Sequence, residues 1–153
     1  MAEVPSELNR EVIEYLSSHR ILTMATADKE GNPDATALEY VNDQFIVFVS
    51  VRPGSKKIQN IKENPRVFYE IHDDIPIDFD HVQKVKAIQT LAEGQIIVPV
   101  NPEYQIVFLL FEKKYPIFSK IPKNKRILLK FVPKKIWFLN YAKKMFHRDE
   151  ISF

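Results

Sequence analysis

The stretch "RILTMATADKEGNPDATALEYVNDQFIVFVS", residues 20–50, decides the fold. Two of its runs, "RILTMATAD" and "DATALEYV", have the composition of short β-strands. The segment "KEGNP" joins them, and its Gly31 and Pro33 are typical of a tight turn. An Asn42–Asp43 turn then leads into a third run, "FIVFVS". Because parallel strands would need a long crossover between them, these short turns predict an antiparallel meander of three strands.

Helices are predicted on both sides of this meander. Before it, Ser6 can cap a helix that stops near Ser18, and its apolar residues recur at helical spacing: Leu8, Val12, Ile13 and Leu16. After it, a helix from Ser55 to about Glu63 places Ile58 and Ile61 on its inner face. Asn64-Pro65 ends that helix, and "RVFYEI" is the fourth strand.

The second half of the chain predicts more strands and one more helix. The stretch "HDDIPIDFDHVQ" indicates a loop, and "VKAIQTLAEGQIIV" a long strand in which Gly94 suggests a bulge or bend. Asn101 and Pro102 can start a helix that ends at Tyr115-Pro116. A last strand pair, "RILLKFV" and "KIWFLNY", is interrupted at Pro133. About six strands and three helices without βαβ alternation predict a mainly β (α+β) fold, a small antiparallel barrel formed by a single domain over residues 1–153.

Composition excludes several classes of function. The chain has 45% hydrophobic residues, 27% charged residues and no cysteine, so disulfides, thiolate nucleophiles and sulfur-ligated metal centres are excluded. No run of about 18 apolar residues is present and the N-terminus does not resemble a signal peptide, so we expect a cytoplasmic protein without membrane association.

Charge is distributed unevenly along the chain. The segment Lys113–Arg148 carries twelve Lys or Arg and no Asp or Glu, whereas the rest carries 10 basic and 20 acidic residues. This segment could bind nucleic acid, a membrane surface or an anionic ligand, or it could neutralise the acidic half of the fold or of a second subunit. Because its basic residues are interleaved with a buried strand pattern, we expect no nucleic-acid partner.

Two lysines occupy an unfavourable position in the second predicted helix. Lys56 and Lys57 fall in its first turn, where the helix dipole already places partial positive charge. Both could be solvated, at a cost of about 0.3–1 kcal/mol each at low salt. Alternatively an anion binds there, since helix N-terminal amides, the Ser55 hydroxyl and two ammonium groups suit a phosphate.

The order of motifs resembles the split-barrel flavoprotein superfamily that includes pyridoxamine 5'-phosphate oxidase. In that family a strand, a Gly-x-Pro turn, two strands and a Ser-Arg/Lys-Lys helix ending in Asn-Pro follow one another, as "GSKKIQNIKENPRV" does here. The similarity continues in "KKYP", "FVPKKIWFLNY" and the tail "AKKMFHRDEISF", and covers about Leu8 to Phe153. The resemblance implies a six-stranded antiparallel split β-barrel with about three flanking helices.

The resemblance also implies a homodimer that binds FMN between its subunits. Ser55, Lys56 and Lys57 match the family's phosphate-binding segment, and Gln89 lies where the long strand often supplies a polar group to the flavin. Further matching positions lie along the ribityl chain and ring, namely Ser50 and Val51, or near the isoalloxazine, namely Thr36, Ala37 and Leu38. The oxidase's arginine and lysine on the second strand are replaced by Thr36 and Val41, so the resemblance implies a relative of the oxidase with another substrate.

The C-terminal tail is the remaining candidate part of the site. Trp137, His147 and Arg148 could reach the partner subunit's flavin, whereas Trp137 could instead be a core residue and His147 a solvated one. We therefore expect an FMN-dependent oxidoreductase that transfers hydride at flavin N5 to or from an unidentified small molecule. The alternatives are a flavin, deazaflavin or haem binding protein without its own turnover, and a nucleic-acid binder.

The acidic loop could in principle hold a metal ion. Two histidines and four carboxylates lie within ten residues: His72, Asp73, Asp74, Asp78, Asp80 and His81. Because they lack the spacing of a zinc-protease motif or a calcium loop, we expect a solvated loop and no metal site.

Overall fold

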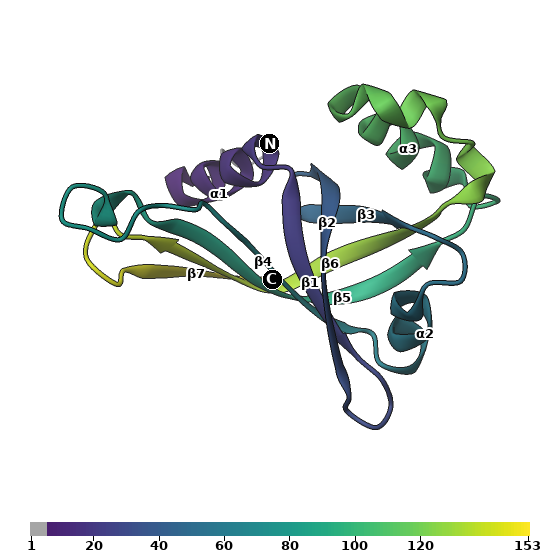
Figure 1. Ribbon diagram of the computed structural model, residues 1–153, viewed down its shortest axis with the longest axis horizontal. Helices are drawn as coiled ribbons and strands as arrows, with labels where there is room; N and C mark the ends of the chain where they lie inside the picture. Colours follow the sequence, from purple (N-terminus) through teal and green to yellow (C-terminus); the bar gives the residue numbers. More distant parts are fainter. Residues whose placement is uncertain (1–5) are drawn as a thin grey trace.

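The computed structural model describes residues 6–153, and within this range it contains seven strands and three α-helices (Figure 1). The strands are β1 (Ile21–Ala27), β2 (Pro33–Asp43), β3 (Ile46–Val51), β4 (Arg66–His72), β5 (Lys86–Ile97), β6 (Ile127–Asn140) and β7 (Arg148–Ser152). The α-helices are α1 (Glu7–Ser18), α2 (Lys56–Glu63) and α3 (Pro102–Lys114). Short 3-10 helices are η1 (Val82–Lys84), η2 (Pro116–Lys120) and η3 (Lys123–Lys125).

The sheet closes into an antiparallel barrel. Its strand order is β3-β2-β1-β4-β5-β6-β7, and an additional pairing between β3 and β6 joins the ends of the first six strands. The predicted six-stranded split barrel with three helices is therefore confirmed. Figure 1 shows the three helices at separate places around the sheet, with the β1–β2 hairpin extending beyond it.

Two apolar clusters hold the helices on the barrel. The larger cluster fills the barrel with residues such as Tyr69 and Phe131, and includes Val12 and Leu16 of α1 and Ile61 of α2. The smaller cluster lies under α3 and buries one face of it: Tyr104, Val107, Phe108 and Phe111. The predicted N-caps are present, because Ser6, Ser55 and Asn101 each accept a hydrogen bond from the backbone of the following turn.

The structure corrects the predicted position of the second turn. β2 continues through Asn42 and Asp43, which pair with Val47 and Ile46. The turn lies at Gln44–Phe45 instead, where Gln44 has a φ of 54° and its carbonyl accepts a hydrogen bond from the Asn42 side chain. Asn42 therefore stabilises the turn from the preceding strand.

The predicted break at Pro133 is also wrong, because β6 runs through it as one strand. Leu91 pairs with Lys135 and Ala92 with Pro133, so Lys134 is the extra residue of a β-bulge. A proline lacks the backbone donor that a regular ladder requires, and an irregular position in the ladder accommodates it.

Of the predicted bulge or bend at Gly94, the bulge is absent, because Gly94 pairs in register with Phe131 and the irregularity lies at Leu91/Ala92. The glycine has a packing role. A Cβ at this position would lie 3.0 Å from Cγ2 of Val67 and 3.2 Å from Cδ1 of Ile61, which belongs to α2. The glycine therefore lets α2 approach the sheet closely.

The C-terminal tail contains a strand that the sequence did not predict. β7 pairs with the free edge of β6, from Lys135 opposite Ser152 to Leu139 opposite Arg148. No helix within residues 6–153 is long and apolar enough to cross a membrane.

Candidate functional site

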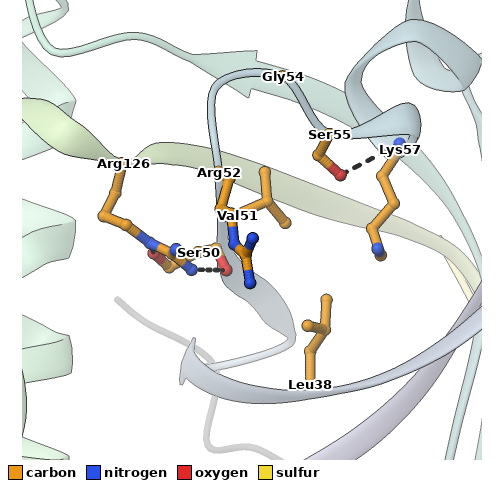
Figure 2. A pocket seen from close by; sticks show the side chains of 8 residues that line it. All are labelled: Leu38, Ser50, Val51, Arg52, Gly54, Ser55, Lys57 and Arg126. Atoms are coloured by element: carbon orange, nitrogen blue, oxygen red, sulfur yellow. Dashed lines mark hydrogen bonds between the residues drawn. The ribbon is translucent and has the colours of Figure 1, made fainter.

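A cavity of about 620 Å³ opens where β2 and β3 diverge. β2 pairs with β3 only from Tyr40 to Asp43, and the rest of β2 pairs with β1 alone. Figure 2 shows the residues that line this cavity: Leu38, Ser50, Val51, Arg52, Gly54, Ser55, Lys57 and Arg126. They come from β2, β3, the turn into α2, α2 itself and the residue directly before β6. The cavity volume lies within the range of about 300–1,000 Å³ that is typical of small-molecule sites.

The first turn of α2 borders the cavity on one side. The Ser55 hydroxyl accepts a hydrogen bond from the backbone N–H of Lys57 at 3.3 Å and so caps the helix. This turn contains no acidic residue, so its partial positive charge is not neutralised from within the helix. The Lys57 side chain points into the cavity in Figure 2, which adds a full positive charge to the same side.

Arg126 borders the cavity on the side of β3. Its Nε donates to the Ser50 hydroxyl and its NH2 group to the Ser50 carbonyl, both at 2.8 Å. The Tyr104 hydroxyl lies 2.9 Å from the Arg126 carbonyl and holds the backbone on α3. Burial lowers the pKa of the Arg126 guanidinium, Glu39 raises it, and the like charge of Arg52 lowers it again.

The cavity is therefore cationic. Arg52, Lys57 and Arg126 line it, and none of the described residues in its wall is acidic. A concave surface lined by one sign of charge attracts ligands of the opposite sign. The arrangement is chemically suited to an anionic ligand with a phosphate or carboxylate group.

The structure brings five of the predicted site residues together at this cavity: Leu38, Ser50, Val51, Ser55 and Lys57. Thr36 lies outside the cavity wall, two residues from Leu38 on β2, where the side chains of alternate residues share a face. Ala37 points to the other face of the strand and is exposed. Lys56 lines a separate hollow of about 250 Å³ next to Asp28.

The other four predicted residues lie around β6 and β7, away from this cavity. Gln89 pairs with Trp137 across the β5–β6 ladder, and the Trp137 indole N–H donates to the Glu150 carboxylate at 2.9 Å. The Arg148 guanidinium carbon lies 5.5 Å from the centroid of the Trp137 ring. His147 Nε2 lies 3.0 Å from the Asp149 carboxylate. Within one copy of the chain, these residues form a second group rather than part of the cavity.

Sequence reasoning missed Arg52 and Arg126. Arg52 directly precedes the recognised "PGSKK" segment, so its position beside the capped helix was a usable signal. Arg126 is 76 residues from Ser50 in sequence, and only the β3–β6 pairing that closes the barrel brings the two together. No local pattern reports such a contact.

The histidines of the acidic loop are engaged by neighbouring carboxylates. His72 Nδ1 lies 2.8 Å from the Glu70 carboxylate, and His81 Nδ1 lies 2.7 Å from that of Asp78. Across residues 6–153, no three His, Asp or Glu side chains form a group that could hold a metal ion.

Comparison with known proteins identifies similar families and folds. The family model described as pyridoxamine 5'-phosphate oxidase matches residues 8–140. A search of curated proteins gives no significant match.

Three solved structures with the same fold illustrate the range of its relatives. The conserved hypothetical protein Rv2991 from Mycobacterium tuberculosis is 22% identical with a TM-score of 0.74, over 92% of this chain and 88% of that one. HutZ, the heme storage protein from Vibrio cholerae, is 15% identical with a TM-score of 0.68, over 94% and 92%. A putative pyridoxamine 5'-phosphate oxidase from Listeria innocua is 16% identical with a TM-score of 0.70, over 88% and 99%. At these identities the likeness shows a shared fold.

Proposed function

Because the chain belongs to the pyridoxamine 5'-phosphate oxidase family, which matches it over residues 8–140, we propose that it is a cytoplasmic FMN-dependent oxidoreductase. It would act as a homodimer on a small molecule. The observation that carries this proposal is the cationic cavity between β2 and β3, which has three positively charged side chains and no carboxylate among its described lining residues. Such a cavity favours a cofactor with a phosphate group.

The residues at the cavity fit FMN. Ser55, Lys57 and the backbone N–H groups at the start of α2 would hold the phosphate through charge-assisted hydrogen bonds. Ser50, Val51 and Leu38 would line the more apolar part of the cofactor. When bound, the flavin supplies hydride transfer at its N5 position. The contribution of the chain is to bind the phosphate, orient the ring and exclude water from it.

A second copy of the chain would complete the site. Phe68 and Leu91 are exposed on β4 and β5, and the Phe68 ring stacks near Trp137 at a centroid distance of 6.1 Å. This apolar stretch of sheet suits a contact between subunits. We propose that, in a dimer formed there, the second group of residues approaches the flavin of the partner subunit. This group consists of Gln89, Trp137, His147 and Arg148.

A rival proposal is a flavin, deazaflavin or haem binding protein without its own turnover. HutZ is described as a heme storage protein, and it shares the fold of this chain. This shared fold supports keeping haem as the alternative ligand, because one fold can carry sites for different ligands.

The proposal is tested by size-exclusion chromatography of the purified protein after separate incubation with FMN and with haem, with detection of visible absorbance. We expect the flavin double band to co-elute with a dimer, to bleach when NAD(P)H is added without oxygen, and to return when a small-molecule acceptor is then supplied. A sharp Soret band after haem addition, with no uptake of FMN, would refute the proposal and favour the rival. Uptake of FMN without any turnover would remove the enzymatic part of it.

A further inference from the structure

The positive charges in the cavity lie on two sides. Figure 2 shows Ser55 and Lys57 on the side of α2, Ser50 and Arg126 on the opposite side, and Arg52 between them. A single phosphate group held at α2 is therefore separated from Arg126 by the width of the cavity. The charge at Arg126 needs another explanation.

The amount of charge also exceeds what one phosphate requires. A phosphate monoester carries about −1.5 to −2 at pH 7. Lys57 and the helix dipole, which adds about +0.5, already neutralise most of it. Arg52 and Arg126 add two further positive charges, and Glu39 offsets part of the charge of Arg126 from a distance. Within residues 6–153 neither arginine makes an ion pair with a carboxylate within 4.0 Å.

Arg126 is held in place with unused donors. Its two hydrogen bonds to Ser50 use two of the five N–H donors of a guanidinium, so three remain available. The Tyr104 hydroxyl lies against the carbonyls of both Lys123 and Arg126 and so positions the backbone of this segment as well. A guanidinium fixed in this way suits the planar, bidentate recognition of a carboxylate or phosphate at a low entropic cost.

We infer that Arg126 and Arg52 form a second anion subsite in the cavity, which holds an oxyanion group of the substrate while α2 holds the cofactor phosphate. This inference rests on the proposed function, because it takes the α2 side to be occupied by FMN. The substrate class is then a small molecule that carries a carboxylate or a phosphate. Arg52, which directly follows β3, would contact the same oxyanion group as Arg126. It lies between Arg126 and Lys57 in Figure 2.

The first test asks which side of the cavity binds the cofactor phosphate, by comparing a flavin that has the phosphate with one that lacks it. FMN and riboflavin, which lacks the phosphate, are titrated against wild-type protein, Lys57→Gln and Arg126→Gln by flavin fluorescence. We expect Lys57→Gln to reduce the preference for FMN over riboflavin at least tenfold, and Arg126→Gln to change it less than threefold. An equal loss of preference in both variants would assign Arg126 to the cofactor phosphate and overturn the inference. A loss of both FMN and riboflavin affinity in Arg126→Gln would assign it to the flavin ring, with the same consequence.

The second test asks whether a second anion binds. Inorganic phosphate and acetate are titrated separately into FMN-saturated protein, with the flavin absorption spectrum as the readout. We expect one or both to perturb the spectrum of the wild type at millimolar concentration, and the affinity to fall at least fivefold in Arg126→Gln and in Arg52→Gln. The probe with the higher affinity indicates whether the substrate carries a phosphate or a carboxylate. No binding of either probe to the FMN-saturated wild type would overturn the inference.

Matched controls keep the result specific. Lys125→Gln removes an exposed charge next to Arg126 in sequence that does not line the cavity, and it should leave all titrations unchanged. Arg126→Lys keeps the charge without the bidentate geometry, and circular dichroism checks the fold of each variant. If the wild type takes up no FMN, the proposed function fails separately. The phosphate titration is then made on the protein alone by thermal shift, where loss in both arginine variants supports the subsite and an unchanged shift refutes it.

Discussion

Two hollows lie on either side of the first turn of α2, and they treat neighbouring lysines differently. Lys57 lines the cationic cavity, whereas Lys56 lines the smaller hollow together with Asp28, Glu30 and Glu63. Because successive residues of a helix are rotated by about 100°, one step along the chain moves the side chain from one hollow to the other.

The smaller hollow satisfies its polar groups internally. The Asp28 carboxylate accepts hydrogen bonds from the backbone of Glu30 and Asn32 at 2.9 Å, and the Glu63 carboxylate accepts one from Gln59. Hydrogen bonding from Asn32 lowers the pKa of Asp28, and hydrogen bonding from Gln59 lowers that of Glu63. The larger cavity has no such carboxylates among its described residues. The carboxylates of the smaller hollow already have partners within the chain, which indicates a structural role. The cationic side chains of the larger cavity have no carboxylate beside them in the described part of its wall, which indicates a place for an anionic ligand.

The largest expected effect is the difference between Lys57→Gln and Lys56→Gln in FMN affinity. Loss of a charge-assisted hydrogen bond to the phosphate should cost about 1.5–3 kcal/mol in Lys57→Gln. Lys56→Gln should change the affinity less than about threefold, because Lys56 lines the acidic hollow and not the cationic cavity. Fluorescence titration of both variants measures the difference. Equal losses would show that both lysines contact the phosphate and would remove the contrast between the hollows.

A smaller effect is expected from Gly94→Ala, which tests whether close packing holds α2 between the two hollows. The added methyl group would crowd Val67 and Ile61, so the free energy of unfolding should fall by about 1–3 kcal/mol. Gly54→Ala is the matched control, since nothing lies within 4 Å of a Cβ at that position. Urea unfolding of both variants gives the values. A Gly94→Ala protein as stable as the wild type would mean that α2 can move without cost.

The smallest effect is expected at Lys114. This lysine is partly buried, and its partners are an uncharged carbonyl and an aromatic ring. Its ammonium donates to the His19 carbonyl and lies 4.4 Å from the centroid of the Tyr40 ring. Burial, with a contribution from Arg20, lowers the pKa of Lys114 to about 8. Between pH 8 and the unfolded pKa of about 10.4, the unfolded chain binds more protons, so the free energy of unfolding should rise with pH.

The rise should amount to less than about 1 kcal/mol, because water still reaches part of the ammonium group. Urea unfolding between pH 7.5 and pH 9.5 measures it as the difference between the wild type and Lys114→Met, because tyrosines of the unfolded chain, with a pKa of about 10, begin to ionise in this range and affect both proteins alike. Lys114→Met should abolish the rise, and Lys113→Met, at an exposed neighbour, should retain it. The same slope in Lys114→Met and the wild type would assign the pH dependence to another group.

Most of the fold could be predicted because local patterns determine it. The helix caps at Ser6, Ser55 and Asn101 and the apolar periodicity of α3 depend on residues a few positions apart. Apart from the shifted turn after Asp43, the errors lie where distant pairing decides the outcome. Pro133 is accommodated by a bulge opposite β5, and β7 forms because the edge of β6 is available to it.

The candidate site follows the same division. Ser55 and Lys57 could be recognised from one short segment, and they line the cavity. Arg126 could not, because its place beside Ser50 depends on the β3–β6 pairing that closes the barrel. The contrast between Lys56 and Lys57 was also hidden, since it depends on which strands lie on each side of α2.

The most direct test of the central claim is an equilibrium titration of the wild-type protein with FMN and with riboflavin at the same ionic strength. If the uncompensated charge of the cavity binds the cofactor phosphate, FMN should bind at least about tenfold more tightly than riboflavin, since each charge-assisted hydrogen bond contributes about 1.5–3 kcal/mol. Equal affinities, or no binding of either flavin, would contradict the account.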